Sequence, residues 1–428
     1  MRKIALISEH ASPLAKPGSI DSGGQNVYVA QLAMHLARLG YLVDVFTRRD
    51  STLLDQVVDW VPGVRVVHVP AGPAHFIQKE SMLPFMEQFA RFMIRFARRE
   101  KIPYDLVHAN FFMSGIVAKQ VRQALGIPFV ITFHALGRVR RLSQKEADGF
   151  PDARFDIEEQ LMREADRVIA ECPQDRQDME ALYHAPADRI DIVPCGFDPD
   201  EFWPVTLDAR QQLGLNRDEF IILQLGRMVP RKGVDNVIEA TAILRHRYKV
   251  PVRLLVVGGN SETPDPVATP ELGRLQRKTR ELGIDDCVTF TGQRQRGQLR
   301  YYYSAANVFV TTPWYEPFGI TPLEAMACGT PVVGSAVGGI KTTVVDGETG
   351  CLVPPKDPEA LAERLEWLYR HPHAAQRMGW SGMRRAYQNY TWRSVAGNVA
   401  AVYERVLEPA GTYPLPPLVA SGEVGLRS

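Results

Sequence analysis

The sequence predicts a sharp turn from a strand into a helix at Pro313-Trp314-Tyr315-Glu316-Pro317-Phe318-Gly319-Ile320-Thr321-Pro322-Leu323-Glu324-Ala325-Met326-Ala327-Cys328-Gly329. The apolar run 306–311 before it is typical of a buried strand that ends at a proline. Thr321 suits a helix cap, Pro322 suits the first helical turn, and Gly329 suits the helix end. We therefore expect Glu316 in the turn and Glu324 in the first turn of the helix.

This turn predicts an anion site between two carboxylates. The amides from Phe318 to Thr321 would lie unpaired at the positive end of a helix, where phosphate binds readily. Glu316 and Glu324 on either side could accept hydrogen bonds from hydroxyl groups, and a phosphate flanked by hydroxyls describes a nucleotide sugar. The same residues also fit a capping box, in which Glu324 only bonds to the helix end opposite Thr321.

The two glutamates and the seven residues between them resemble the signature of the retaining glycosyltransferases of family 4. That family has the GT-B fold, an α/β architecture of two Rossmann-like parallel-sheet domains that face each other across a cleft. The resemblance implies that Glu316 holds the hydroxyls of the donor sugar and that Glu324 holds the ribose. It also implies that the amides of Phe318, Gly319, Ile320 and Thr321 hold the diphosphate. The resemblance covers about residues 4–407.

Composition limits the classes that the chain can belong to. A length of 428 residues with 45% hydrophobic content fits two domains of about 200 residues each. A net charge of +1 gives no field that would point to nucleic acid. The five cysteines are odd in number and widely spaced, so we expect neither a disulfide framework nor a zinc site. We expect the protein to reside in the reducing cytoplasm. No apolar run approaches the roughly 18 residues of a membrane span.

The first half of the chain alternates strands with helices, which predicts a parallel sheet. Strand 4–8, a glycine turn at Gly23 and Gly24, and a helix to Leu39 make a Rossmann-like opening. Alone, these glycines are typical of any tight turn. The family resemblance implies that their amides approach the distal phosphate of the donor and the acceptor. The further strands expected in this half are 41–47, 64–69, 104–108, 128–134, 168–172 and 190–194.

The segment 85–101 is expected to be an amphipathic helix with phenylalanines on one side and arginines mostly elsewhere. A basic helix of this kind can lie on an anionic membrane surface. Packing of its apolar side against the sheet is the commoner fate and is the expectation here.

Two histidines, His108 and His134, stand at the ends of predicted strands. Ligands of such sheets bind outside the carboxyl ends of the strands, although either histidine alone is typical of a structural residue. The resemblance implies that the imidazole of His134 meets the donor sugar and that its carbonyl faces the reacting carbon.

A basic cluster follows His134, and such charges usually form a solvated surface; its members are Arg138, Arg140, Arg141 and Lys145, followed by Arg154. A phosphorylated acceptor would nevertheless need such cations, arginine above all. The resemblance to the D-inositol-3-phosphate glycosyltransferases of mycothiol synthesis implies phosphate contacts for Lys79 and Arg154. Phe111 and Ala135 stand where those enzymes carry a Tyr and a Thr, which weakens inositol phosphate as the acceptor. The candidate acceptor-binding residues are Lys79, His108, Arg138 and Arg154.

The second half predicts another parallel sheet, with strands at 220–225, 252–257, 288–294 and 331–334. Arg227 and Lys232 follow the first of these strands, and the resemblance implies that they neutralise the departing diphosphate. Arg231 is a further candidate there. Arg294 falls where relatives read the base, which favours uridine. Residues 346–350 predict a hairpin turn, and 358–369 a helix.

The domain organisation follows from these segments. We expect an acceptor-binding domain at 1–197 and a nucleotide-sugar-binding domain at 209–390, joined by a linker. Asp198 and Asp200 in that linker are typical turn residues and not a metal pair. A last helix, 392–407, is expected to pack back on the first domain, and 409–428 is expected to be a flexible tail.

The sequence therefore predicts a metal-independent hexosyltransferase. It would move a hexose, glucose in our interpretation, from a UDP-sugar to a small hydroxyl acceptor with retention, and would need no other cofactor. His134, Arg227, Lys232 and Glu316 are the candidate catalytic residues. Sucrose-phosphate synthases and sucrose synthases share the Gly-Gly-Gln opening, which makes fructose 6-phosphate one candidate acceptor.

Other functions stay open on the sequence alone. A lipid-linked or polysaccharide acceptor is one alternative, and a non-catalytic nucleotide-sugar sensor is another. A dehydrogenase is a poorer choice, because the first turn lacks the Gly-x-Gly-x-x-Gly spacing.

Overall fold

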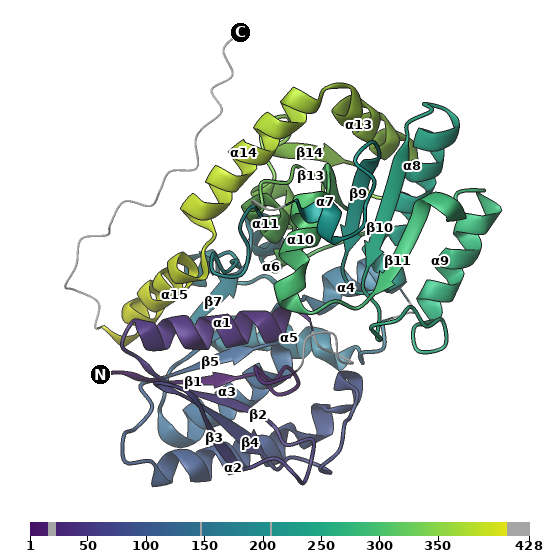
Figure 1. Ribbon diagram of the computed structural model, residues 1–428. Helices are drawn as coiled ribbons and strands as arrows, with labels where there is room; N and C mark the ends of the chain where they lie inside the picture. The colour runs from purple at the N-terminus through teal and green to yellow at the C-terminus, as the bar shows by residue number, and fades with distance from the viewer. Residues whose placement is uncertain (16–22, 146–147, 206–207, 409–428) are drawn as a thin grey trace.

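The computed structural model describes residues 1–15, 23–145, 148–205 and 208–408, so the predicted tail 409–428 lies outside the described residues. Two α/β units lie one above the other in Figure 1, each built on its own mainly parallel sheet. The fold class predicted from the sequence is confirmed.

The first sheet is parallel except at one edge. Its strand order is β3-β4-β2-β1-β5-β6-β7-β8, and only the pair β3–β4 is antiparallel within the described chain. Ile4 and Leu6 of β1 pack in one core cluster with residues of the helices 24–38 and 392–407, while Ala5 and Ile7 pack in another with residues of the helices 86–99 and 112–125. Burial on both faces explains the continuous apolar run of this central strand. The strands are β1 Lys3–Ile7, β2 Leu42–Arg48, β3 Val57–Val61, β4 Val64–Val69, β5 Leu106–Asn110, β6 Phe129–Thr132, β7 Arg167–Ala170 and β8 Ile190–Ile192.

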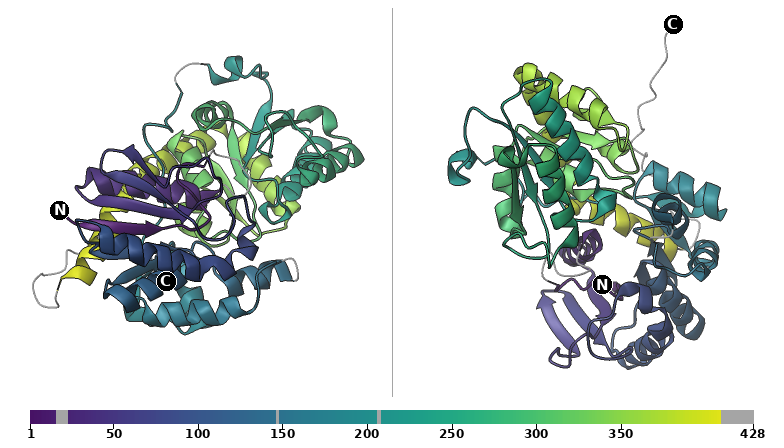
Figure 2. Two further views of the ribbon diagram at one scale, coloured as in Figure 1. Left: turned by 90° about the horizontal axis from the view of Figure 1, so that it is seen from below. Right: turned by 90° about the vertical axis from the view of Figure 1, so that its right-hand side faces the viewer.

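Helices cover this sheet on both faces (Figure 2). They are α1 Gly24–Arg38, α2 Met86–Arg99, α3 Phe112–Leu125, α4 Gly137–Gln144, α5 Ala153–Glu164 and α6 Pro173–Tyr183. The apolar face of α2 is buried through Met86, Phe89 and Met93, and the helix packs on α3. The expected packing of this segment inside the domain is thus observed. None of the described helices is long and apolar enough to cross a membrane.

The second sheet is parallel throughout, with strand order β11-β10-β9-β12-β13-β14. Its strands are β9 Phe220–Leu225, β10 Val252–Val257, β11 Val288–Gly292, β12 Val308–Thr311, β13 Val332–Ser335 and β14 Gly350–Val353. Its helices are α7 Ala209–Gln212, α8 Val234–His246, α9 Pro270–Glu281, α10 Arg296–Ala305, α11 Ile320–Ala327, α12 Ile340–Thr343, α13 Pro358–Arg370 and α14 Pro372–Asn389. Short 3-10 turns occur at Lys79–Ser81, Leu83–Phe85, Ala187–Arg189, Pro230–Lys232 and Asp285–Cys287.

The hairpin predicted at 346–350 is wrong. The turn exists, since the Gly347 N–H donates to the Gly350 carbonyl at 2.8 Å. It leads, however, into β14, which pairs parallel to β13 and not antiparallel as a hairpin requires. Helix α12 supplies the crossover between the two strands.

The last helix, α15 Trp392–Leu407, lies along α1 of the first unit (Figure 1). The chain passes between the units twice, and the two passages are hydrogen-bonded to each other. The Phe197 N–H donates to the Tyr390 carbonyl at 2.9 Å, and the Trp392 N–H donates to the Phe197 carbonyl at 3.1 Å. The exact domain boundaries at 197 and 209 stay predictions.

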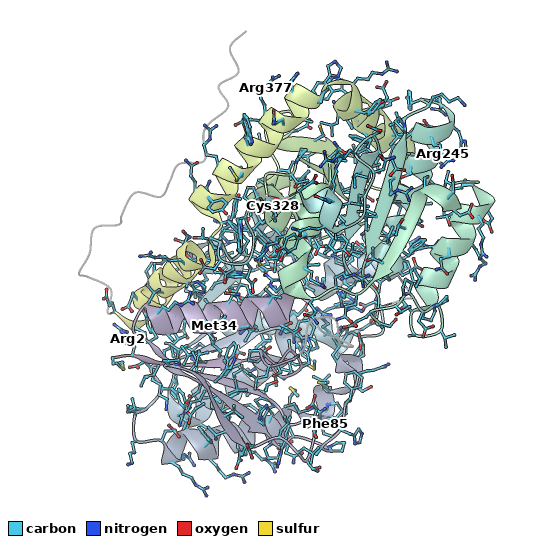
Figure 3. The ribbon with its side chains drawn as sticks, in the orientation of Figure 1. Arg2, Met34, Phe85, Arg245, Cys328 and Arg377 are labelled. Atoms are coloured by element: carbon cyan, nitrogen blue, oxygen red, sulfur yellow. The ribbon has the colours of Figure 1, made fainter. Side chains whose placement is uncertain are left out.

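The cysteines take no part in crosslinking. All five are free and buried, and Figure 3 shows Cys328 inside the second unit.

Candidate active site

A cleft of about 750 Å³ lies between the two units, and both units line it. That volume is typical of a site for a small molecule or cofactor. His134 follows β6, Arg227 follows β9, and the stretch 314–321 follows β12. The cleft therefore lies where the carboxyl ends of parallel strands meet, as expected for a ligand site in such sheets.

One wall of the cleft is the amino end of α11. The helix begins at Ile320, and Gly319 caps it with φ 92° and ψ 93°, a conformation that favours glycine. Thr321 is therefore the second residue of the helix, and its predicted role as the cap is wrong. Within the described part of the chain, the amides of residues 318–321 have no hydrogen-bond acceptor. They form an open anion site at the positive end of the helix.

The glycine turn before α1 faces this helix end. A β-carbon built on Gly23 would lie 3.7 Å from the guanidinium carbon of Arg227, and one built on Gly24 would lie 3.8 Å from Cδ1 of Ile320. The amino ends of α1 and α11 thus approach each other from opposite units. Two positive helix ends and the Arg227 guanidinium favour an anion between them.

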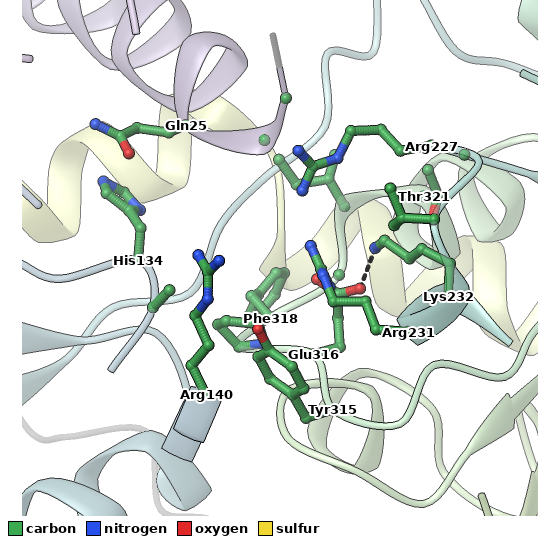
Figure 4. A pocket seen from close by; sticks show the side chains of 18 of the residues that line it. Gln25, His134, Arg140, Arg227, Arg231, Lys232, Tyr315, Glu316, Phe318 and Thr321 are labelled. Atoms are coloured by element: carbon green, nitrogen blue, oxygen red, sulfur yellow. Dashed lines mark hydrogen bonds and ion pairs between the residues drawn. The ribbon is translucent and has the colours of Figure 1, made fainter. Parts of the chain in front are cut away.

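Lys232 and Glu316 form an ion pair on the floor of the cleft (Figure 4). Burial lowers the pKa of Lys232, and the carboxylate of Glu316 opposes that effect. Burial alone would raise the pKa of Glu316, but Lys232, Arg231 and Arg227 more than offset it and hold this pKa below its usual value. The Glu316 carboxylate therefore remains ionised at neutral pH.

His134 lies on the opposite wall and is fixed from two sides. Its Nδ1 is 2.9 Å from Oε1 of Glu171, and its Nε2 is 3.0 Å from Oδ1 of Asn110. The Asn110 side chain is itself held, because its Nδ2 donates to the Ile7 carbonyl at 3.2 Å. The residue has φ 58°, an unusual value outside glycine that turns the chain sharply at the end of β6. Both ring nitrogens are thus occupied in this structure.

Glu324 lies beneath the cleft and does not line it. Its Oε2 accepts from the Tyr303 hydroxyl at 2.9 Å, and its Oε1 pairs with Arg296 at 3.0 Å. No capping bond to the helix end is formed, so the capping-box interpretation is wrong. Its predicted position also shifts, because a helix that begins at Ile320 places Glu324 in the second turn.

Arg294 is likewise outside the lining of the cleft. Its Nε donates to the Tyr302 hydroxyl at 3.0 Å, and its Nη1 donates to the Glu262 carbonyl at 2.8 Å. The structure therefore holds this guanidinium against the loop that follows β10. Its predicted contact with the base stays a prediction.

Of the four predicted acceptor residues, Lys79 lines the cleft and the other three do not. His108 is fully buried, with Nδ1 2.7 Å from the Tyr403 hydroxyl and Nε2 2.9 Å from Oγ1 of Thr132. Burial, followed by the charge of the nearby His134, lowers the pKa of His108 to about 3. It is a structural residue of the first core.

The two predicted arginines are engaged elsewhere. Arg154 is completely buried, where its Nε donates to Glu158 at 2.6 Å and its guanidinium lies 4.6 Å from the ring centre of Phe150. Arg138 pairs with Glu159 at 3.1 Å and stacks on Tyr183, away from the cleft. The structure thus brings neither arginine to the candidate acceptor side.

Other lining residues were not assigned to the site from the sequence. They include His10, Gln25, Arg140, Gln144, Glu171 and Tyr315. Gln144 of α4 donates from Nε2 to the Tyr315 hydroxyl at 2.7 Å and so connects the two units. Arg140 belongs to the basic cluster after His134, and its spacing from Gln144 places both residues on one helix face, but no motif marks α4 in the sequence.

The described residues contain no group of three or more His, Cys, Asp and Glu side chains that could hold a metal ion.

The two facing Rossmann-like units and the cationic, amide-lined cleft between them define a nucleotide-sugar-dependent glycosyltransferase with the GT-B fold. The chain belongs to the family 4 glycosyltransferases. Residues 22–201 match the family model described as Glycosyltransferase Family 4, and residues 206–385 match the one described as Glycosyl transferases group 1.

Comparisons with individual proteins agree with this assignment. The D-inositol 3-phosphate glycosyltransferase of Kribbella flavida is 36% identical over 416 residues, which cover 95% of this chain and 96% of the relative. The structure of sucrose-phosphate synthase from Thermosynechococcus elongatus superposes with a TM-score of 0.86 at 36% identity, covering 95% of this chain and 99% of the other. Anabaena HepE, solved in complex with UDP-glucose, has a TM-score of 0.74 at 21% identity over 95% of this chain and 100% of its own, a likeness of fold.

Proposed function

We propose that this protein transfers glucose from UDP-glucose to a small acceptor hydroxyl, with retention at the anomeric carbon. The observation that carries the proposal is the Lys232–Glu316 pair beside the open amides of α11. The anion site suits a phosphate, and the ionised carboxylate beside the same cation suits hydroxyl groups. A nucleotide sugar carries both kinds of group next to each other.

The donor diphosphate would bind the amides of Gly319 and Ile320 together with Arg227 and Lys232. Lys232 would then exchange part of its contact with Glu316 for a phosphate oxygen. The freed carboxylate of Glu316 would accept hydrogen bonds from hexose hydroxyls. HepE was solved with UDP-glucose, and uridine also agrees with the position of residues 290–294 in the sequence.

The transfer would proceed on one face of the sugar. The bond from the anomeric carbon to the diphosphate oxygen breaks, and the acceptor oxygen forms its bond from the same side. The acceptor proton passes to an oxygen of the departing phosphate. Arg227, Lys232 and the helix amides would stabilise the charge that builds up on that phosphate, and His134 would support the sugar ring.

The acceptor is proposed to be a small phosphorylated sugar such as fructose 6-phosphate. The names of the relatives support this class, since one is an inositol 3-phosphate glycosyltransferase and another a sucrose-phosphate synthase. A lipid-linked acceptor gains less support, because the apolar face of α2 is already buried. We further propose that the enzyme acts in the cytoplasm and needs neither a metal nor another cofactor.

The test is UDP release from UDP-glucose in the presence of EDTA. The acceptors are fructose, fructose 6-phosphate, glucose, inositol 1-phosphate and a lipid extract, each compared with no acceptor. Stimulation by fructose 6-phosphate but not by fructose is the expected result. UDP-glucose binding without release under any condition would favour a nucleotide-sugar sensor. A requirement for added Mg²⁺ would contradict the metal-independent mechanism.

A further inference from the structure

Two arginines line the cleft but make none of the donor contacts proposed above. Arg231, which the sequence offered as a further candidate for the diphosphate, belongs to the 3-10 turn Pro230–Lys232 after β9, and Arg140 belongs to α4 of the other unit. Figure 4 shows both side chains reaching into the cleft, one from each unit.

Arg231 has a buried nitrogen that the protein does not satisfy. Its Nη1 has no hydrogen-bond partner among the described residues. No described carboxylate forms an ion pair with it, because the nearby Glu316 is bonded to Lys232. Its guanidinium carbon lies 5.3 Å from the centre of the Tyr315 ring. A buried guanidinium nitrogen without an acceptor is costly, so this one indicates a missing anion.

Arg140 is held along one edge only. Its Nε is 2.8 Å from Oδ1 of Asp148, its Nη2 is 3.6 Å from Oε1 of Glu80, and its guanidinium lies over Phe150. These contacts orient the side chain, and they engage its Nε and Nη2 atoms. None of these contacts within the described residues involves Nη1, which leaves this nitrogen as a donor for a ligand in the cleft.

The elements that carry the two arginines are connected to each other. Gln144 lies one helical turn after Arg140, and its amide donates to the Tyr315 hydroxyl at 2.7 Å. Tyr315 in turn carries the Arg231 contact. Arg140 and Arg231 are therefore fixed on the two sides of one bridge between the units.

The charged side chains that line the cleft are mainly basic. Its lining contains Lys79, Arg140, Arg227, Arg231 and Lys232, against the carboxylates of Glu171 and Glu316. Arg140 is paired with Asp148 and Glu80, whereas no described carboxylate pairs with Arg231. A lining of this kind attracts anionic ligands.

We propose that Arg140 and Arg231 form a second anion site, which binds the phosphate group of the acceptor between the two units. The inference rests on the proposed function, because it assigns the second anion to the acceptor. The Nη1 nitrogens of the two guanidinium groups would each donate a charged hydrogen bond to a phosphate oxygen. The acceptor phosphate then contacts both units at once. Its binding therefore favours the arrangement of the two units in which transfer takes place.

The experiment measures binding to the full chain by calorimetry, in two arms. One arm titrates UDP, and the other titrates inorganic phosphate or fructose 6-phosphate with and without saturating UDP. The variants are Arg140→Ala, Arg231→Ala and Arg231→Gln, the last in case the alanine variant folds poorly. Arg163→Ala in α5 is the matched control, since it removes the same charge from the same unit but its guanidinium pairs with Glu159 outside the cleft.

Each site variant is expected to weaken both phosphate ligands about 10- to 100-fold, the usual effect of losing a charged hydrogen bond. UDP affinity should stay within threefold, and Arg163→Ala should match the unchanged protein in the affinity for every ligand. The proposal is overturned if the variants bind phosphate normally, if the unchanged protein binds none, or if Arg231→Gln loses UDP to the same extent. Failure of the unchanged protein to bind UDP would instead refute the proposed function, while the phosphate arm without UDP still decides the role of the arginines.

Discussion

The substitution Glu316→Gln separates sugar orientation from nucleotide binding. The structure holds this carboxylate in an ion pair with Lys232, at a pKa below its usual value. In the proposed complex its two oxygens accept hydrogen bonds from hexose hydroxyls. A hydrogen bond to a charged group is worth about 1.5–3 kcal/mol, so two such bonds supply about 3–6 kcal/mol. Glutamine offers one neutral acceptor in their place.

The expected result is a fall in turnover of about 10²- to 10⁴-fold. UDP lacks the hexose, so its affinity should stay within about threefold or increase, because Lys232 would no longer be shared with a carboxylate. Turnover is measured as UDP release at saturating donor and acceptor, and affinity by calorimetry. Glu348→Gln, in the exposed turn before β14, is the control. Turnover within tenfold of the unchanged protein would refute the reasoning, as would a loss of UDP affinity equal to the loss of turnover.

Three further predictions follow from other groups. Arg227→Ala should weaken UDP and UDP-glucose together by about 10- to 100-fold in calorimetry, and an unaltered UDP affinity would exclude it from the diphosphate site. His108→Ala should lower the free energy of unfolding by about 2–4 kcal/mol in urea while leaving the acceptor KM unchanged, because His108 is buried against Tyr403 and Thr132; a raised KM at normal stability would contradict this. Burial, and then the charge of Glu171, raises the pKa of Asp175 to about 8. The folded state therefore retains a proton that the unfolded chain loses, and the free energy of unfolding falls as the pH rises towards 8. Asp175→Asn should therefore raise the Tm by about 2–4 °C at pH 8 and by less at pH 5, and an equal change at both would argue against the shift.

The fold could be predicted where strands are buried on both faces. The bounds of β9 and β10 agree with the predicted strands 220–225 and 252–257, because continuous apolar runs leave little freedom at their ends. β3 was missed, since it is an exposed edge strand that pairs antiparallel. α14 was missed as well, because Gly379 and Gly382 interrupt its helical signal. A β-carbon on Gly379 would lie 2.1 Å from the Gly329 carbonyl oxygen, so close packing requires that glycine.

The candidate site was predictable only as far as local motifs extend. Glu316 and Lys232 belong to short patterns, and the structure brings them into contact. His108 and His134 look alike in the sequence, yet one lies within β5 and points into the core while the other lies beyond the end of β6. Arg140 and Tyr315 come from segments far apart in the chain. Their proximity depends on how the two units pack, which no local pattern contains.

The paired passages of the chain between the units have a mechanical consequence. A single connecting strand would let the units swing and twist about any axis. Here the backbone of Phe197 is hydrogen-bonded to Tyr390 and Trp392. Twisting one unit against the other would break these two hydrogen bonds, whereas bending the two passages together need not break them. The pairing also sets a rule for making chimaeras with related enzymes. Exchange of the second unit needs two junctions, placed beside each other at Phe197 and Trp392. A single junction would replace α15 as well and remove its packing on the first unit.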